Sequence, residues 1–359
     1  MASQGKIRSQ PEVAPLSGSN RAKRTTMHDV ARLAGVSVMT VSNVVRRQNQ
    51  TVKLETRRRV EDAIARLNYR PNISARRLRV AEEYSIGVVI VDNDPAFLND
   101  PFISRLVSGL SNYLSNQDYT LDIQGVPPER FETATILKKV GNDALCAILC
   151  GPKALRRQHL EYLQTTGQPV VVFQEPFKST SGNVAVVAQD DLGAGRLVAE
   201  HLLRSKLRSI MFVRPTLDWP AVEQREKGLR AVFESKDSAV EIFTSLVPSE
   251  RFDDVRAAVA AQLAKRTPDA IVAATDSMAA AALEACEADG LNVPGDITIT
   301  GFNGFDVWRY TRPRLTTVIS PAYEMGQYAG ELLVTRLRSG EFAKRNTVFP
   351  VALQVGGSS

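Results

Sequence analysis

The sequence predicts a small all-α head followed by a two-lobed α/β body that contains two doubly wound parallel sheets. Three observations support this fold class. Residues 1–80 carry short amphipathic helical patterns separated by a glycine and by polar segments. From Ser85 onward, buried-strand patterns alternate with helical patterns, as in parallel βαβ units. About nine strands would make one sheet unusually large, so two lobes that face each other across a cleft fit better.

Four segments are expected along the chain. They are a basic disordered leader (1–24), a helix-turn-helix domain (25–71), a hinge helix or linker (72–84) and the two-lobed body (85–359). The leader is assigned because its residues include almost no large apolar side chains and so cannot nucleate a core.

The first helix is predicted from its cap and its apolar face. Thr26 followed by Asp29 has the spacing of an N-terminal cap. Val30, Leu33 and Ala34 then fall on one helical face, which we expect to be buried.

A glycine-containing turn separates the first two helices. Gly35 tolerates a positive φ and suits the turn. Ser37 can cap a second helix that runs to Val45, and a third helix is expected over 54–67. Two short helices joined by such a turn, with a third packed behind, describe a helix-turn-helix, although an ordinary three-helix bundle has the same pattern.

A short basic stretch follows the head. Residues 73–79 carry Arg76, Arg77 and Arg79 around a single leucine, Leu78. This stretch is too small to fold alone, so we expect it to become ordered only on a partner.

The body is predicted from alternating strand and helix patterns. Strands are expected at 86–91, 119–123, 147–150, 170–173, 184–188, 209–213, 240–243, 270–274 and 297–301. Helices are expected between them, at 102–116, 192–204, 219–234, 252–265 and 277–289. In folds of this class, ligands bind at the carboxyl ends of the strands.

Charge is distributed unevenly along the 359 residues. Residues 1–80 hold 17 Lys and Arg against 5 Asp and Glu, a net charge of +12. The rest of the chain holds 28 basic and 34 acidic residues, a net charge of −6, so the whole chain carries +6. A basic head on a mildly acidic body indicates that the head meets a polyanion. A merely solvated basic face is the alternative on charge alone.

No enzyme signature is present. The sequence has no nucleophile elbow, no His-Glu-x-x-His and no phosphate-binding loop. The glycines at 193 and 195 suggest a dinucleotide turn, but the third glycine is missing, and a helix start packed close to a strand is the favoured explanation. We therefore expect no catalytic residues and no cofactor.

Metal binding and membrane insertion are also not expected. Solvated or capping roles are favoured for the histidines, which are His28, His159 and His201, and buried reduced thiols for the cysteines, which are Cys146, Cys150 and Cys286. Apolar runs such as 86–91 stop far short of the roughly 18 residues that a membrane span needs. We expect a soluble, cytoplasmic protein.

Several motifs in order along the chain match a known family. In the head they are Asp-Val-Ala-Arg-Leu-Ala-Gly-Val-Ser at 29–37, Thr-Val-Ser at 40–42, Thr-Arg at 56–57, Tyr-Arg-Pro-Asn at 69–72, Ala-Arg at 75–76 and Leu78. In the body they are 200–202, Arg225 with Gly228, 293–294, 301–302, 315–318 and 325–326. With these motifs the sequence resembles the lactose and galactose repressor family of bacterial transcription regulators over most of its length.

The resemblance implies a sequence-specific DNA-binding head. The recognition helix that begins at Ser37 would point its first turn at base edges in the major groove, with Val38, Met39 and Asn43 in base-reading places. The DNA-contacting residues implied for the head are Thr26, Ser37, Val38, Met39, Thr40, Ser42, Asn43 and Thr51.

In the hinge, the resemblance implies that Leu78 is an apolar wedge between base steps in the minor groove. Simple packing of Leu78 against its own body is the alternative. The DNA-contacting residues implied for the hinge are Asn72, Ala75, Arg76, Arg77, Leu78 and Arg79.

The body would then resemble periplasmic sugar-binding proteins, which grip a ligand between two lobes. Arg225 matches an arginine whose donor fork suits ligand hydroxyls or a carboxylate. The implied effector-binding residues are Asp92, Asp94, Gln174, Trp219, Arg225, Thr275, Asp276 and Asn303. Trp219 or Trp308 could stack on a sugar face, and a core role is as common for either.

Two departures from the family pattern bear on the effector. The family usually has Asn where this chain has Thr275, and Asp where it has Asn303. The loss of a carboxylate acceptor weakens the case for a plain neutral hexose. An acidic sugar derivative is therefore an alternative, with three arginines close by in sequence, Arg309, Arg312 and Arg314.

Together these features predict a homodimer, rather than a tetramer, that binds near-palindromic operator DNA and responds to a sugar or sugar derivative. We expect a repressor, and the residues leave activation open. The rival hypothesis is a sugar-processing enzyme or solute binder with an incidental basic head, which does not explain why a capped helix-turn-helix and a hinge precede the cleft.

Overall fold

The structure is a computed structural model of the chain. It describes residues 26–45, 53–67, 84–139, 141–176, 179, 182–236 and 238–359. The chain divides into two compact units between Glu82 and Glu83. The predicted leader (1–24), Thr51 and the hinge residues Asn72, Ala75, Arg76, Arg77, Leu78 and Arg79 lie outside the described residues.

The head contains three helices, α1 (Met27–Ala34), α2 (Val38–Val45) and α3 (Leu54–Arg66). Asp29 N donates to Thr26 Oγ1 at 3.3 Å and Thr26 N donates to Asp29 Oδ2 at 3.0 Å, which completes a capping box on α1. Gly35, at φ 64°, ends the helix in the left-handed conformation. The predicted cap and turn are confirmed.

The core of the head forms where the three helices meet. Val30, Val41 and Val60 are fully buried there. The prediction that Leu33 shares the buried face of α1 is wrong, since Leu33 is 49% exposed. At about 100° per residue, the buried side chains of α1 centre on the sector between Val30 and Ala31, and Leu33 lies outside that sector.

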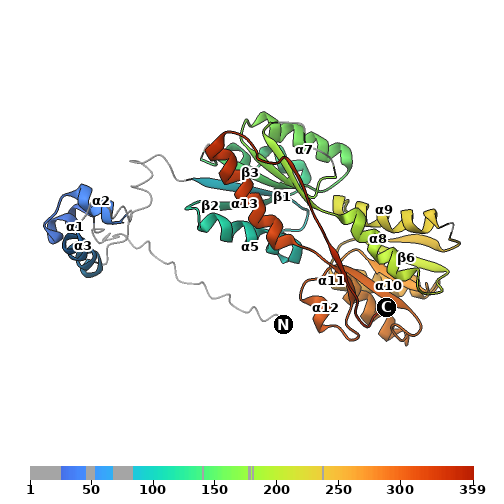
Figure 1. The fold of residues 1–359 in the computed structure, drawn as a ribbon. Coiled ribbons are helices and arrows are strands. Elements are labelled where there is room, and N and C mark those ends of the chain that lie inside the picture. The colour runs from blue at the N-terminus through green and yellow to red at the C-terminus, as the bar shows by residue number, and fades with distance from the viewer. Residues whose placement is uncertain are drawn as a thin grey trace, which may run out of the picture. The chain divides into compact units, whose positions relative to one another are not determined.

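The first lobe of the body is built on a parallel six-stranded sheet (Figure 1), in the order β11-β5-β4-β3-β1-β2. Its strands are β1 (Ser85–Val91), β2 (Thr120–Val126), β3 (Ala144–Ile148), β4 (Val170–Phe173), β5 (Val184–Gln189) and β11 (Asn346–Phe349). Its helices are α5 (Pro101–Ser115), α6 (Thr135–Lys138), α7 (Lys153–Thr165) and α13 (Ala322–Ser339).

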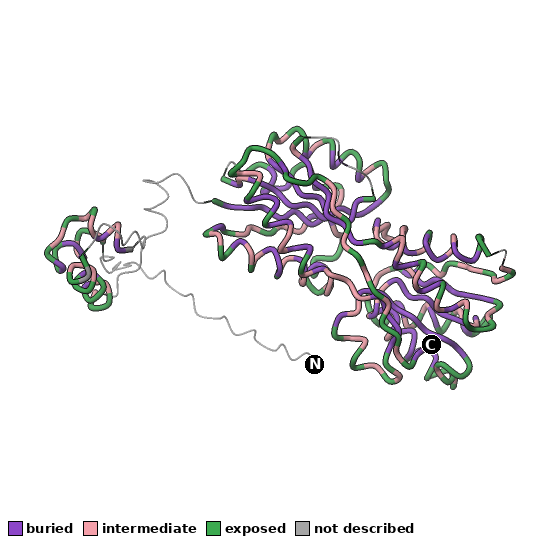
Figure 2. Tube along the Cα trace, in the orientation of Figure 1, coloured by how far each residue is buried: buried purple, intermediate pink, exposed green. Residues whose placement is uncertain are grey.

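Both faces of this sheet are covered, so its four inner strands, β5, β4, β3 and β1, are buried along their whole length (Figure 2). Along β1, Ile86, Val88 and Ile90 pack with residues of α5 and α13. The alternate side chains, Val89 and Val91, pack with residues of α6 and α7. The period-2 alternation of β1 therefore joins two apolar layers.

The second lobe repeats this architecture, with the strand order β12-β10-β9-β8-β6-β7. Its strands are β6 (Ser209–Pro215), β7 (Glu241–Val247), β8 (Ala270–Ala273), β9 (Thr298–Asn303), β10 (Thr316–Ile319) and β12 (Ala352–Gln354). Its helices are α8 (Asp191–Leu202), α9 (Pro220–Ser235), α10 (Phe252–Leu263), α11 (Asp276–Ala288) and α12 (Val307–Tyr310). Only the edge strand β12 pairs antiparallel, against β10, among the strand pairs of the described residues.

The chain crosses between the lobes three times, after β5, after β10 and after β11. The crossings are bonded to one another. Asp190 N donates to Phe349 O at 2.9 Å, and Ser320 Oγ donates to Gln189 Oε1 at 2.6 Å. The dark red C-terminal segment of Figure 1 makes the third crossing. These bonds hold the three crossings together between the lobes.

The nine predicted strands are confirmed, although β3 begins three residues before its predicted start, at Ala144 rather than Ala147. Strands β10, β11 and β12 and helices α6, α7, α12 and α13 were not predicted. The three cysteines are reduced and buried, as expected, and burial raises the pKa of each thiol. Among the helices of the described segments, none is long and apolar enough to cross a membrane.

Two packing predictions are wrong. His159 is neither solvated nor a cap, because it is buried and its ring stacks on Phe131 with a centroid distance of 4.2 Å. The glycine at 195 does not bring a helix close to a strand. It lies where α8 meets α9, because a Cβ added there would come within 2.0 Å of Arg225 O.

Candidate functional site

The first turn of α2 exposes both polar and apolar side chains to solvent. Ser37 is exposed and Met39 is 70% exposed, whereas Val41 and Val44 are buried beneath them. Ser37 Oγ accepts from Thr40 N at 3.1 Å and lies 2.9 Å from Thr40 Oγ1. The cap therefore fixes the start of the helix and leaves Met39 free to meet a partner.

The other residues predicted to contact DNA in the head differ in exposure. Val38 is half-buried and packs against the core of the head. Ser42 and Asn43 are also half-buried. The Thr26 hydroxyl donates to Asp29 Oδ2 at 2.7 Å and so is part of the capping box.

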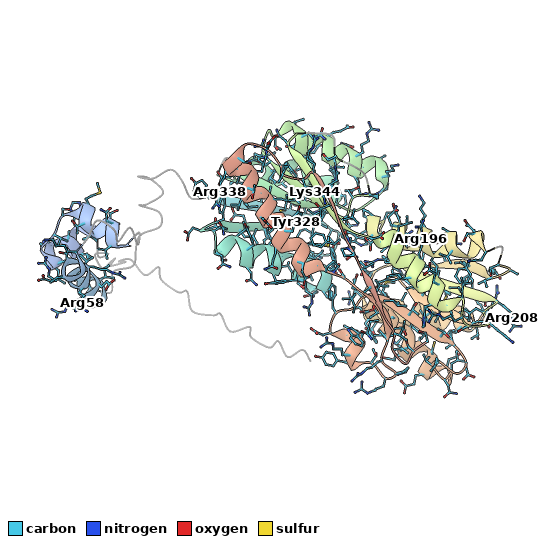
Figure 3. The ribbon with its side chains drawn as sticks, in the orientation of Figure 1. Arg58, Arg196, Arg208, Tyr328, Arg338 and Lys344 are labelled. Atoms are coloured by element: carbon cyan, nitrogen blue, oxygen red, sulfur yellow. The ribbon has the colours of Figure 1, made fainter. Side chains whose placement is uncertain are left out.

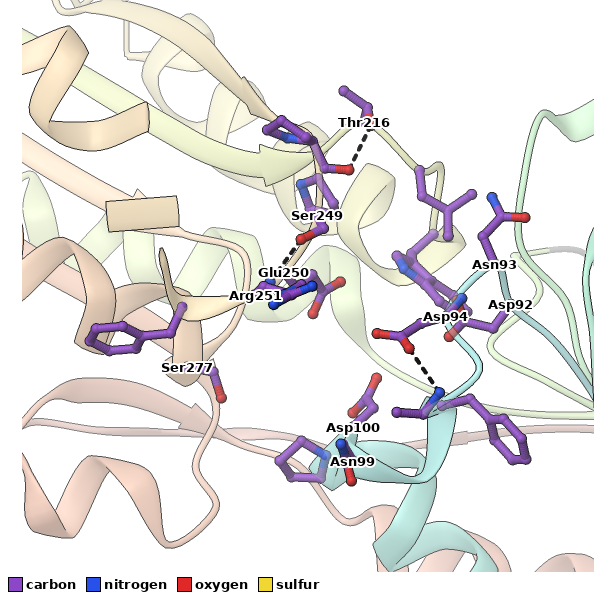
Figure 4. Close-up of a pocket in the computed structure, with 18 of the residues that line it drawn as sticks. Asp92, Asn93, Asp94, Asn99, Asp100, Thr216, Ser249, Glu250, Arg251 and Ser277 are labelled. Carbon is purple, nitrogen blue, oxygen red and sulfur yellow. Dashed lines mark hydrogen bonds between the residues drawn. The ribbon is translucent and has the colours of Figure 1, made fainter. Parts of the chain in front are cut away.

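A cavity of about 770 Å³ lies between the two lobes. Its walls come from the carboxyl ends of β1, β6 and β7 and from the segments that follow them, and Figure 4 shows the residues that face it. This is the edge at which ligands bind in open parallel sheets.

Asp92 and Asp94, which were predicted at the cleft, line this cavity in the turn after β1. Asp92 Oδ1 accepts from Asp94 N at 2.9 Å, and Asp94 Oδ1 accepts from Ala96 N at 2.8 Å. Burial raises the pKa of Asp92. Each carboxylate keeps acceptor capacity for a ligand.

Deeper between the lobes lies a narrow cavity of about 50 Å³. It brings together four predicted residues, and these are Gln174, Arg225, Thr275 and Asn303. Trp219 lines both this cavity and the wide one. Both tryptophans pack against apolar core, but Trp308 lines neither cavity, so Trp219 is the tryptophan placed to contact a ligand.

Arg225 is 3% exposed, and its guanidinium is already surrounded by protein acceptors. Its Nε donates to Asp191 Oδ1 at 2.8 Å, one terminal nitrogen donates to Ala274 O at 2.8 Å, and the other donates to Asn303 Oδ1 at 2.9 Å. A guanidinium has five N–H donors, so two remain for a ligand. Arg225 therefore supports the crossing after β5, through Asp191, as well as the cavity.

Gln174 and Asp276 are also committed to internal bonds. Gln174 Nε2 donates to Asp191 Oδ2 at 3.0 Å, and Gln174 Oε1 accepts from Gln189 N at 2.9 Å. Asp276 accepts from the Thr317 hydroxyl at 2.6 Å and from Gly304 N at 2.8 Å. Burial raises the pKa of Asp276 to about 7.

Thr275 caps helix α11 by accepting from Met278 N at 3.3 Å. It lines the narrow cavity together with Asn303. The departures from the family pattern at Thr275 and Asn303 therefore face the space where a ligand would lie.

Among the cleft residues that were not predicted are two carboxyls, Asp100 from the first lobe and Glu250 from the second. Both line the wide cavity, the narrow one and a third, smaller cavity beside them. Asp100 is the N-cap of α5 and accepts from Phe102 N at 2.7 Å. Its place before a proline that starts a helix was a visible signal for the cap, whereas nothing in the local pattern marked Glu250.

The two carboxyls affect each other. Burial is the main cause of the raised pKa of Asp100, which is about 6. Backbone hydrogen bonds from Phe102 and Ile103 lower this pKa, and the charge of Asp92 raises it. Burial and then the charges of Asp100 and Asp92 raise the pKa of Glu250 to about 8, and Arg225 opposes this shift. In the described residues, no group of His, Cys, Asp and Glu side chains is arranged to hold a metal ion.

Comparisons with known proteins agree with this architecture. Residues 26–72 match the family of bacterial regulatory proteins, lacI family, and residues 199–359 match the periplasmic binding protein-like domain. Catabolite control protein A of Priestia megaterium is 30% identical over 310 residues, which are 86% of this chain and 91% of that protein. The ribose operon repressor of Halalkalibacterium halodurans is 29% identical over 316 residues, 87% of this chain and 90% of that protein.

Two solved structures share the fold. The lac repressor dimer bound to operator and the anti-inducer ONPF aligns with a TM-score of 0.79 at 24% identity, over 94% of this chain and 99% of that chain. A complex of the transcriptional regulator CelR with cellobiose aligns with a TM-score of 0.66 at 25% identity, over 94% of this chain and 100% of that chain.

The helix-turn-helix head, the two-lobed body and a relative that is 30% identical across most of both chains lead to one conclusion. The protein belongs to the lacI family of bacterial regulatory proteins, and it is a transcription regulator.

Proposed function

We propose that this protein is a repressor that binds operator DNA through its head, and that a polyhydroxylated effector in the interlobe cleft controls this binding. The observation that carries the proposal is the cavity of about 770 Å³ between the lobes, at the carboxyl ends of their strands. Names of similar proteins favour a sugar, since they include a ribose operon repressor and a regulator in complex with cellobiose.

The proposal assigns a role to each part of the chain. Residues 25–71 bind DNA, 72–84 form the hinge, and 85–359 bind the effector and dimerise. The similar lac repressor structure is a dimer on its operator, and we infer a homodimer that acts in the cytoplasm on a near-palindromic site. We assign the cleft to binding rather than to catalysis, so the protein is not an enzyme.

Within the head, we propose that Met39 reads bases together with Val38 and Asn43. Leu78 and its neighbouring arginines in the hinge would open a base step in the minor groove. Support for Met39 comes from its exposure at the start of α2, above a buried valine row.

The direct test is to recover DNA fragments that the purified full-length protein retains, and to measure binding to them with and without sugars. We expect a near-palindromic fragment bound about a thousandfold or more tightly than random DNA, and at least one sugar that changes this affinity. Equal affinity for all fragments would contradict the proposal.

Replacing Met39 with Ala tests the reading helix. The change removes an exposed side chain, so the head should stay folded, while operator binding should weaken by about 1–3 kcal/mol. Leu33→Ala is the matched control because Leu33 is also exposed but lies on α1. Fluorescence anisotropy on operator and random DNA measures both, and an equal loss on the two DNAs would contradict base reading by Met39.

A further inference from the structure

The wide cavity has an excess of negative charge. Five carboxylates line it, and these are Asp92, Asp94, Asp100, Glu250 and Asp253. The only cationic side chain among its lining residues is Arg251. In Figure 4 the carboxylates of Asp94 and Asp100 from the first lobe and of Glu250 from the second point into the same space. A ligand there meets carboxyl groups from both lobes.

The arginines that suggested an acidic effector do not correct this imbalance. Arg309, Arg312 and Arg314 are exposed, and none of them lines the three cavities described above. Other basic side chains, such as Arg208 and Arg338, lie on the outer surfaces of the lobes (Figure 3). Arg225 is close by, but its charge is neutralised by Asp191 at 2.8 Å.

Glu250 lines all three cavities and, within the described residues, is without a hydrogen-bond or ion-pair partner. By contrast, one oxygen of Asp100 is held by Phe102 N. The raised pKa values of Asp100, about 6, and Glu250, about 8, follow from burial and from their shared neighbours. Ionising both groups is therefore unfavourable, and a cation between them would remove that cost.

We propose that the effector is a sugar that carries a protonated amine, and that Asp100 and Glu250 hold the ammonium group from opposite lobes. This inference rests on the proposed effector role of the cleft. Trp219, at the junction of the wide and narrow cavities, offers its ring to the apolar face of the sugar. An organic ammonium suits the site better than a metal ion, because the described carboxylates are not arranged as a metal-binding group.

Calorimetric titration of the full-length protein at neutral pH tests the charge class directly. The probes are three matched pairs, glucosamine with glucose, galactosamine with galactose and mannosamine with mannose, together with glucuronate. We expect at least one amine to bind about tenfold or more tightly than its neutral partner, a difference of about 1.4 kcal/mol, and to release protons as Glu250 ionises. Tighter binding of a neutral or acidic sugar would overturn the proposal, and so would the absence of saturable binding by all three amines.

Charge-removing variants locate the contact. Glu250→Gln and Asp100→Asn should each abolish the preference for the amine over its neutral partner, and Asn keeps the capacity to cap α5. Glu287→Gln, at an exposed position of α11, is the matched control and should keep the preference. An undiminished preference in Glu250→Gln would overturn the assignment.

The two proposals fail in different ways. If a neutral sugar binds and changes operator affinity, the regulator function stands and only the ammonium assignment falls. If an amine binds with the expected preference but leaves operator affinity unchanged, the assignment stands and the control of DNA binding falls.

Discussion

At the scale of single residues, Arg225 is the centre of a buried network of hydrogen bonds in the body. Arg225 joins Asp191, Ala274 O and Asn303, and Asp191 in turn accepts from Gln174 and Gln189. The sequence predicted Arg225 as a ligand-binding residue. It could not reveal that the carboxylate of Asp191, at the start of α8, would neutralise the guanidinium. Arg225, which was expected only to bind the effector, thus holds Asp191, and Asp191 in turn bonds to Gln174 and Gln189 of the first lobe.

Replacing Arg225 with Ala should therefore destabilise the body. The change leaves the buried carboxylate of Asp191 without its counter-charge, which costs about 3–5 kcal/mol in the free energy of unfolding. Urea unfolding followed by tryptophan fluorescence measures this loss. Arg196→Ala, at an exposed position on the outer surface of α8 (Figure 3), is the control and should change stability by less than about 0.5 kcal/mol. Equal stability of the two variants would contradict the structural role of Arg225.

Glu250 should make stability depend on pH. Its pKa is raised from 4.5 to about 8 in the fold, so the folded protein binds a proton that the unfolded chain has released between these values. Stability contributed by this proton is present below pH 4.5 and is lost as pH rises to about 8. Glu250→Gln removes the titration, so its stability relative to the parent should rise across this window. A difference that stays constant with pH would contradict the raised pKa.

At the scale of elements, the head was the most predictable part. Thr26, Asp29 and Gly35 carry local signals whose physics acts within one turn of chain, and all three are confirmed. Strands such as β1 and β4 were found because their residues are buried on both faces. Strands β11 and β12 are half-exposed edge strands at the end of the chain, so they lack the continuous apolar run that identifies a buried strand.

Helix pairing depends on glycines whose role appears only in three dimensions. In the first lobe α5 crosses α13 at Gly109 and Gly326, where an added Cβ would lie 2.0 Å from a backbone oxygen of the other helix. In the second lobe Gly195 and Gly228 bring α8 and α9 together in the same manner. Each lobe thus has a helix pair that crosses closely at two glycines.

Replacing Gly326 with Ala should separate α5 from α13. The added methyl meets Leu106 O, which belongs to a rigid helix and cannot move alone, so overpacking should cost about 1–3 kcal/mol or more. Gly182→Ala is the control, because an added Cβ there meets nothing within 4 Å. Thermal unfolding of both variants measures the difference. A Gly326→Ala melting temperature equal to that of the control would contradict the close crossing.

At the scale of the whole molecule, the lobes meet through contacts beside the cleft as well as at the three crossings of the chain. Arg105 on α5 pairs with Asp306 at 2.8 Å, and Gly151 N donates to Asp218 O at 2.8 Å. The doubly wound architecture was predictable from alternating patterns, but the opposition of Asp100 and Glu250 was not. These residues are far apart in sequence, and only the facing of the two sheets brings both to one cavity.

The cleft and the head are expected to act on one equilibrium. Linkage requires operator DNA to change effector affinity by the same factor by which the effector changes operator affinity. The direct measurement is calorimetric titration of the tightest-binding hexosamine into the full-length protein, with and without saturating operator. We predict a shift of about 5–150-fold in effector affinity, equal to the shift in operator affinity measured by anisotropy. An effector affinity that is the same on and off DNA would mean that the cleft and the head are not coupled.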